Sequence, residues 1–176
     1  MLGRSDPREF QGCVTDAINI VTIVVLLLTC AGLIWTDLRS GLLPDWMNAL
    51  VAASGFARLA TLVDLPEALW NCAAALALGS ALLLLRLLYA MARGRQGLGL
   101  GDVKFLMAAT LWAGLPNMPI LLLIAATTAL AAALVLFIMG RRLTGQTALP
   151  FGPFLVLGLL AVLALQATGS ELLVTF

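Results

Sequence analysis

The sequence predicts an all-α membrane protein, a transmembrane helical bundle of about six spans, and three observations support this fold class. Of the 176 residues, 62% are hydrophobic and only 11% are charged, whereas roughly 25% of the residues in a soluble domain are charged. The mean hydropathy is +1.06. Apolar runs recur along the chain, and a bilayer can cover apolar surface that a soluble fold of this length could not bury. We therefore expect one integral membrane domain over residues 1–176.

The first three expected spans follow recognisable start signals. Residues 1–16 are polar and of mixed charge, and they do not resemble a signal peptide. A first apolar run of spanning length follows at 18–35. The second span, 46–62, is opened by a Pro-Asp pair. The third, 69–92, follows Asp64-Leu-Pro-Glu67, which has the pattern of a capping box with an early proline.

The last three expected spans differ in length. The fourth, 102–113, covers only about 18 Å of helix at 1.5 Å per residue, so we expect a short helix sunk within the bundle. The fifth, 119–139, is strongly apolar, and the sixth, 151–167, begins among prolines. Six spans place both termini on the same side of the membrane.

The distribution of charge orients this bundle. The loops after the second and fourth spans carry no charged residues except Asp64 and Glu67. Arginine and lysine gather in the cytoplasmic loops of membrane proteins, so the loops after the first, third and fifth spans are expected to be cytoplasmic and both termini non-cytoplasmic. These loops and their flanks carry Arg39, Arg86, Arg93, Arg95, Lys104, Arg141 and Arg142.

Composition also excludes several classes of function. A net charge of +1 argues against a nucleic-acid partner, because neutralising phosphates requires a basic surface. Cys13, Cys30 and Cys72 are scattered and form neither a disulfide framework nor a zinc site, so we expect no metal and no cofactor. The chain has no histidine, which excludes Ser–His and Cys–His nucleophile pairs and HExxH metal sites. A hydrolase of this composition would use carboxylates, or a Ser–Lys pair, but no serine lies near Lys104 in the sequence.

Two aspartates beside the expected spans are candidate catalytic residues. Asp37 follows the first span and Asp102 opens the fourth, and because ionisable residues within or beside membrane spans are energetically costly, they are candidates for a function. The topology places both at the cytoplasmic boundary. Two neighbouring carboxyl groups can share one proton. One can then take a proton from water while the other donates one to the scissile carbonyl or the leaving amine.

The residues around Asp102 allow more than one interpretation. Gly97, Gly99 and Gly101 provide a backbone without Cβ atoms that a substrate strand could approach closely. They equally fit a flexible loop with Asp102 as an ordinary N-cap, and Asp37 equally fits a solvated boundary residue. Lys104 either anchors the chain at the interface or steadies the carboxylates or the substrate. A phosphate-binding loop does not fit, because neither of its glycine patterns is present.

Three segments resemble one known family in the order in which that family carries them. Gly99-Leu-Gly-Asp102 matches the GxGD signature of intramembrane aspartyl proteases, and its continuation through Leu106 resembles type IV prepilin peptidases. Residues 36–45 resemble the first catalytic segment of that family, and residues 149–154 resemble its Pro-Phe-Gly-Pro element. The three segments extend over most of the chain.

The resemblance implies a prepilin leader peptidase, an aspartic-type endopeptidase of the cytoplasmic (inner) membrane. Asp37 and Asp102 would be catalytic, and six residues would bind substrate or shape the site: Gly99, Gly101, Lys104, Pro150, Gly152 and Pro153. The substrates would be prepilin or pseudopilin precursors of a type IV pilus or protein secretion system, cut at the cytoplasmic face. Such precursors have a short basic leader, a glycine before the scissile bond and then a long apolar helix. Larger members carry a cytoplasmic domain associated with N-methyltransferase activity, so we expect a short form without it.

Two other functions fit an apolar bundle. A small transporter would place its polar groups at mid-membrane in paired repeats, but here the ionisable residues cluster at one interface and no repeat is evident. A non-catalytic membrane protein that binds pilins or assists their assembly would not need both aspartates. The sequence leaves the precursor, the pilus or secretion system and the oligomeric state open.

Overall fold

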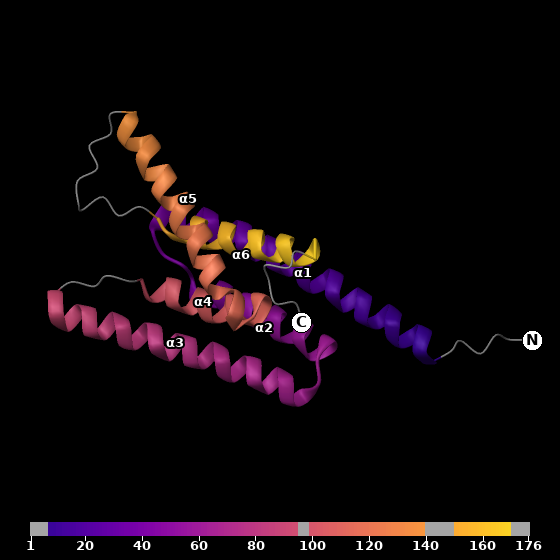
Figure 1. Ribbon diagram of the computed structural model, residues 1–176. Coiled ribbons are helices and arrows are strands. Elements are labelled where there is room, and N and C mark those ends of the chain that lie inside the picture. The colour runs from indigo at the N-terminus through magenta and orange to yellow at the C-terminus, as the bar shows by residue number, and fades with distance from the viewer. Residues whose placement is uncertain (1–6, 95–98, 140–149, 170–176) are drawn as a thin grey trace, which may run out of the picture.

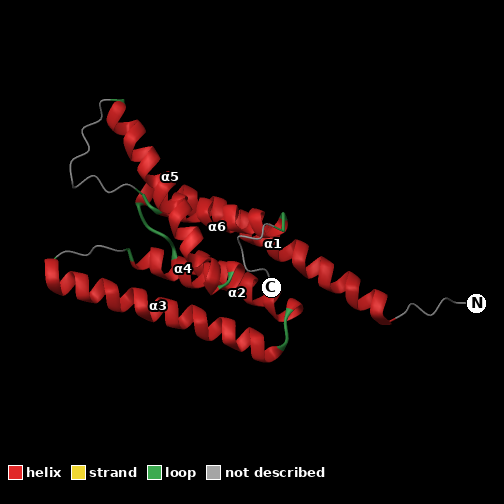
Figure 2. Cartoon of the chain, in the orientation of Figure 1, coloured by secondary structure: helices red, strands yellow, loops and turns green. Residues whose placement is uncertain are grey.

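A computed structural model describes residues 7–94, 99–139 and 150–169, and every regular element in these ranges is a helix (Figures 1 and 2). The expected all-α fold is therefore confirmed. The elements are α1 (Pro7–Ser40), α2 (Asp45–Leu62), α3 (Leu65–Arg93), α4 (Leu100–Ala113), the 3-10 helix η1 (Leu115–Asn117), α5 (Met118–Ile138) and α6 (Gly152–Ala167).

Each expected span falls on one helix, but several helices begin earlier than expected. Helix α1 begins at Pro7 rather than at 18, because proline is favoured in the first turn of a helix and the polar stretch after it continues as helix. Helix α3 begins at Leu65 rather than at 69. Asp64 is its N-cap residue but makes no side-chain cap hydrogen bond, so the capping box expected there is wrong.

Successive helices alternate in direction, and all except α5 run roughly along one axis (Figure 1). Figure 1 shows that α1 and α3 end, and α2, α4 and α6 begin, on the same side of the bundle. Asp37 lies in the last turns of α1 and Asp102 in the first turn of α4, so this side is called the aspartate end below. The start of α1 and the end of α6 lie toward the opposite side, and α5 leans away from the other helices (Figure 1).

The short helix α4 forms the centre of the bundle. Eight of its 14 residues are buried, and it packs against α2, α3 and α6. Trp112 near its end is fully buried and its Nε1–H donates a hydrogen bond to the carbonyl of Val51 in α2, with a length of 2.9 Å. Gly55 makes room for this ring, because a Cβ there would lie 2.8 Å from it. The expectation of a short helix sunk within the bundle is confirmed.

The outer helices present apolar side chains to their surroundings. Three segments are long and apolar enough to cross a membrane: Val14–Ser40, Leu65–Arg93 and Leu115–Ile138. Large side chains such as Leu130 and Ile138 are more than 70% exposed, which is unfavourable in water but not in lipid. The chain is thus a multi-pass membrane protein. Crossing by all six helices stays a prediction.

Replacing Trp112 by phenylalanine is expected to lower the free energy of unfolding by about 1–3 kcal/mol. The change removes a buried hydrogen bond and leaves a small cavity where the indole ring packed. Unfolding of the purified protein by titration with sodium dodecyl sulfate would measure the loss. Trp70 is 74% exposed, so Trp70→Phe is the matched control and should stay within about 0.5 kcal/mol of the wild type. Equal stability of the two variants would contradict the assigned role of Trp112.

Candidate active site

Asp37 is held at the start of α6. Its side chain is only 6% exposed, and its Oδ2 accepts a hydrogen bond of 2.9 Å from the backbone N–H of Gly152. Gly152 is the first residue of α6, and the N-terminus of a helix carries unpaired N–H groups and a partial positive charge. Asp37 is therefore a fixed acceptor beside a helix N-terminus, and the alternative of a solvated boundary residue is wrong.

Gly152 allows this approach because it has no side chain. A Cβ at this position would lie 2.7 Å from Oδ2 and 3.0 Å from Cγ of Asp37. Real Cβ contacts are essentially never shorter than 3.0 Å. Any larger residue would thus push the carboxyl group away from the N–H that holds it.

Asp102 lies on α4, close to the residue that caps the helix. The N-cap residue is Gly99, three positions before Asp102, so the alternative in which Asp102 is itself the N-cap is wrong. The backbone of Gly99 forms a hydrogen bond with Asp102, as the third residue of a capping box does. A Cβ at Gly99 would lie 3.0 Å from Oδ2 of Asp102. Gly99 therefore lies in direct contact with the carboxyl group of Asp102.

The two aspartates face one cavity. They are near enough to interact electrostatically, and both line a cavity of about 870 Å³ at the aspartate end. Its walls come from α1, the α1–α2 connection, the start of α2, α3, α4 and the segment before α6. The remaining lining residues are Leu38, Gly41, Leu42, Leu43, Asp45, Arg86, Gly99, Leu100, Gly101, Lys104, Pro150 and Phe151. The structure thus brings the predicted pair together.

Leu43 links the two halves of the site, a role that the sequence analysis did not assign to it. A Cβ at Gly101 would lie 2.8 Å from Cβ of Leu43, and a Cβ at Gly152 would lie 3.2 Å from its Cδ2. Both glycines therefore make room for the same leucine between α4 and α6. The sequence feature that could have identified Leu43 is its position in the segment 36–45, which also carries Asp37.

Of the other predicted site residues, some line the aspartate cavity and others do not. Lys104 lines the cavity, but its Nζ pairs with Oδ2 of Asp45 at 2.7 Å. Its charged group therefore contacts the start of α2, and a role in steadying the carboxylates or the substrate stays a prediction. Pro150 lines the cavity. Pro153 does not line it, and contributes instead to an apolar groove beside it. Gly97 lies outside the described residues.

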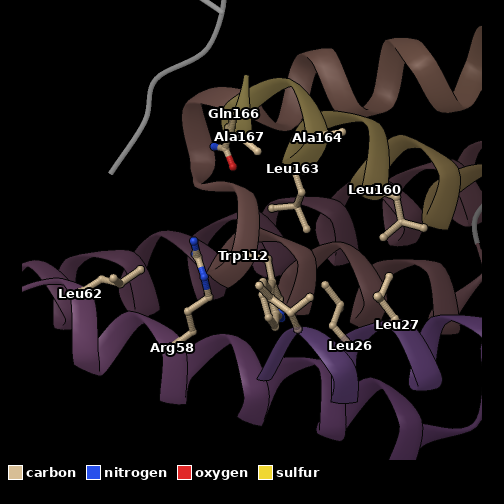
Figure 3. Close-up of a pocket in the computed structure, with 11 residues that line it drawn as sticks. Leu26, Leu27, Arg58, Leu62, Trp112, Leu160, Leu163, Ala164, Gln166 and Ala167 are labelled. Carbon is tan, nitrogen blue, oxygen red and sulfur yellow. The ribbon is translucent and has the colours of Figure 1, made fainter. Parts of the chain in front are cut away.

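A second cavity lies at the opposite end of the bundle. It has a volume of about 390 Å³, and Arg58 and Trp112 line it together with leucines from α1 and α6 (Figure 3). The guanidinium carbon of Arg58 lies 5.6 Å from the centre of the Trp112 ring. Among the described residues, no carboxylate lines this cavity. It therefore does not compete with the aspartate cavity as a site of acid–base chemistry.

The aspartate cavity contains what peptide hydrolysis by carboxylates requires. Two carboxyl groups that interact electrostatically do not ionise equally readily, so that one can act as base and the other as acid. The hydrogen bond from Gly152 orients Asp37 before a substrate arrives. The cavity opens beside apolar grooves, which fits a substrate that is itself held in the membrane.

Comparison with known proteins gives a consistent result. A profile described as the type IV leader peptidase family matches residues 21–137. Leader peptidase HopD of Escherichia coli is 36% identical over 121 residues, which cover 68% of this chain and 76% of that protein. The prepilin leader peptidase/N-methyltransferase of Escherichia coli strain K12 is 31% identical over 157 residues, covering 85% of this chain and 63% of that protein.

The extent of these matches differs between the relatives. The prepilin leader peptidase/N-methyltransferase of Burkholderia pseudomallei strain 1026b is 42% identical over 71 residues, 40% of this chain and 23% of that protein. The chain thus spans about a quarter of that relative but three quarters of the HopD protein. No solved structure matches the chain significantly. With the profile covering well over half of its residues, the chain belongs to the type IV leader peptidase family.

Proposed function

We propose that this chain is an aspartyl endopeptidase that removes the leader from prepilin or pseudopilin precursors, with Asp37 and Asp102 as its catalytic pair. The observation that carries the proposal is the shared cavity, into which α1 and α4 bring one carboxyl group each. The ionised carboxylate takes a proton from water, which attacks the scissile carbonyl. The protonated partner then donates to the carbonyl oxygen or to the leaving amine.

The fixed geometry around the pair supports this role. The hydrogen bond from Gly152 holds Asp37 in position from the side of α6, while the Gly99 backbone holds Asp102 from the side of α4. Preorganised groups of this kind contribute to catalysis because they need not reorganise in the transition state. Gly101, Pro150 and Leu43 line the space between the two helices, so they would contact or position the substrate backbone.

Cleavage at the cytoplasmic face of the inner membrane is part of the proposal. The aspartate end carries Arg39 and Arg93 in the last turns of α1 and α3, while the opposite end carries Asp64 and Glu67 at the start of α3. This asymmetry favours a cytoplasmic aspartate end. Arg95, Arg141 and Arg142, which support the same orientation, lie outside the described residues.

Co-expression with a type IV prepilin precursor tests the proposed function. The precursor is expected to shift to the mature size only when this protein is present, and mass spectrometry of the product should show a single cut after the leader. A precursor whose glycine before the scissile bond is replaced by a bulky residue should remain uncut. If no prepilin or pseudopilin precursor is processed, the proposed function is wrong.

Reporter fusions test the orientation separately. Green fluorescent protein fused after Gly94 should fluoresce, and alkaline phosphatase fused after Val63 should be active, because the first requires the cytoplasm and the second the opposite side. The reverse pattern would place the aspartate end outside the cytoplasm and would contradict cleavage at the cytoplasmic face.

A further inference from the structure

A groove in the side of the bundle lies next to the aspartate cavity. Helices α2 and α3 both pack against α4, and a groove of about 500 Å³ lies between them with α4 as its floor. One wall comes from α2, the other from α3, and the groove is almost entirely apolar apart from its two ionic residues and one asparagine. The lining residues are Asp45, Asn48, Ala49, Ala52, Cys72, Ala75, Leu76, Lys104, Met107, Ala108 and Leu111.

The groove and the aspartate cavity adjoin each other. Asp45 and Lys104, which form an ion pair of 2.7 Å, line both of them. From this pair the α2 wall runs to Ala52, about 10 Å along the helix at 1.5 Å per residue. The polar residues thus lie at the end next to the catalytic pair, and the wall becomes apolar with distance from it.

The α2 wall also contains a polar group that lacks a partner. Asn48 is 4% exposed, and neither its Oδ1 nor its Nδ2 has a hydrogen-bond partner among the described residues. A buried amide without a partner is destabilising, and such groups in native structures need an explanation. A polar atom of an occupant in the groove would supply the missing hydrogen bond.

We propose that this groove binds the apolar helix of the precursor that follows the scissile bond, with Asn48 as its polar contact. The proposal rests on the proposed function and specifies how that site holds its substrate. A chain segment at membrane depth must satisfy its own backbone groups, so an occupant of an apolar groove there is helical. The small side chains of Ala49, Ala52 and Ala75 allow a helix to approach closely.

A second groove is the alternative binding site for the apolar helix of the precursor. It has a volume of about 460 Å³ and also adjoins the aspartate cavity, with which it shares Leu38 and Pro150. Ala132 lies on its α5 wall. Among its described lining residues none is charged or carries a side-chain amide, so it offers no equivalent of Asn48 or of the ion pair. These differences favour the groove between α2 and α3.

Filling each groove in turn tests the proposal. Ala52 and Ala132 are both half-buried alanines that line a groove, so Ala52→Phe and Ala132→Phe are a matched pair. In detergent or vesicles, with a full-length prepilin as substrate, Ala52→Phe is expected to raise KM about tenfold and leave kcat within about twofold, because binding is lost equally in the ground state and the transition state. Ala132→Phe should change neither value beyond about twofold.

A second variant distinguishes a loss of substrate binding from misfolding of the Ala52→Phe protein. Asn48→Leu keeps the side-chain volume while removing the amide, and it is expected to raise KM about threefold in a protein that remains folded. A rise in KM for Ala132→Phe alone, or unchanged KM for both Ala52→Phe and Asn48→Leu, would overturn the proposed groove while leaving the peptidase assignment intact. If the wild type cuts no precursor, the proposed function fails and the groove proposal fails with it.

Discussion

Replacing either Asp37 or Asp102 by asparagine is expected to slow precursor cleavage by at least about 10²-fold, because acid–base catalysis by a positioned side chain contributes roughly 10²–10⁴-fold. Asparagine has almost the same volume as aspartate, but it can neither take a proton from water nor donate an acidic one. Since the two carboxyl groups act as a unit, the double variant should be scarcely slower than either single variant. The measurement is the initial rate of conversion of a prepilin precursor by purified protein.

The stability of the Asp37→Asn protein separates a catalytic role from a structural one. The Oδ1 of an asparagine side chain can still accept the hydrogen bond that Gly152 donates to Asp37. Removing a charge from a side chain that is 6% exposed is not expected to destabilise the fold. Unfolding by titration with sodium dodecyl sulfate should therefore give a free energy no lower than that of the wild type.

Asp64→Asn is the matched control for both aspartate variants. Asp64 is exposed at the end of the bundle away from the cavity, and it makes no side-chain cap hydrogen bond. Its variant should cleave the precursor within about twofold of the wild-type rate. Cleavage at the wild-type rate by the Asp37→Asn or the Asp102→Asn protein would show that the assignment of the pair is wrong.

The location of both aspartates at the same end of the bundle could be predicted because it follows from the order of the helices. Two helices, α2 and α3, lie between the end of α1 and the start of α4, and two crossings in opposite directions return the chain to the same side. The central position of α4 was also predictable, since a helix of this length cannot reach across a bilayer alone. The structure confirms it through the burial of most of that helix.

The contacts that position the aspartates could not be predicted, because they join residues far apart in the sequence. The bond between Gly152 and Asp37 spans 115 positions, and periodicity gives no information about which helix start faces which carboxylate. In the sequence, Gly152 was a candidate site residue only because it lies between Pro150 and Pro153 in the Pro-Phe-Gly-Pro element. The pairing of Lys104 with Asp45 was missed for the same reason, since the first turn of α2 had to be placed beside α4 to reveal it.

Local start signals were only partly reliable. The pattern Asp64-Leu-Pro-Glu67 lies where α3 begins, although the span was expected only from 69, and no side-chain cap bond forms. The exposed position of Asp64 explains this, because water can satisfy the first N–H groups of the helix in place of the side chain. The polar residues after Pro7 were expected to lie outside the first span, but hydropathy alone does not show where a helix begins, and α1 includes them.

Gly152→Ala is expected to have the second largest effect, a decrease in kcat of about 10²-fold, because a displacement of a catalytic group by about 1 Å can have a cost of that size. The new Cβ would lie 2.7 Å from Oδ2 of Asp37 and 3.2 Å from Cδ2 of Leu43. The leucine is flexible and can move aside, but the carboxyl group can do so only by giving up its hydrogen bond to the Gly152 N–H. Precursor cleavage measured at saturating substrate would report kcat directly.

Gly32→Ala is the matched control, since it adds the same methyl group to a helical glycine away from the cavity. Its Cβ would lie 3.0 Å from Cε of Met47, the far end of a flexible side chain that can shift at little cost. Alanine also favours the helix over glycine by about 1 kcal/mol, so this variant should be as stable as the wild type and equally active. If Gly152→Ala retained the wild-type kcat, the bond between α6 and Asp37 would not be needed for catalysis. If both variants lost activity in parallel with stability, the effect would lie in the packing of α1 rather than in the position of the carboxyl group.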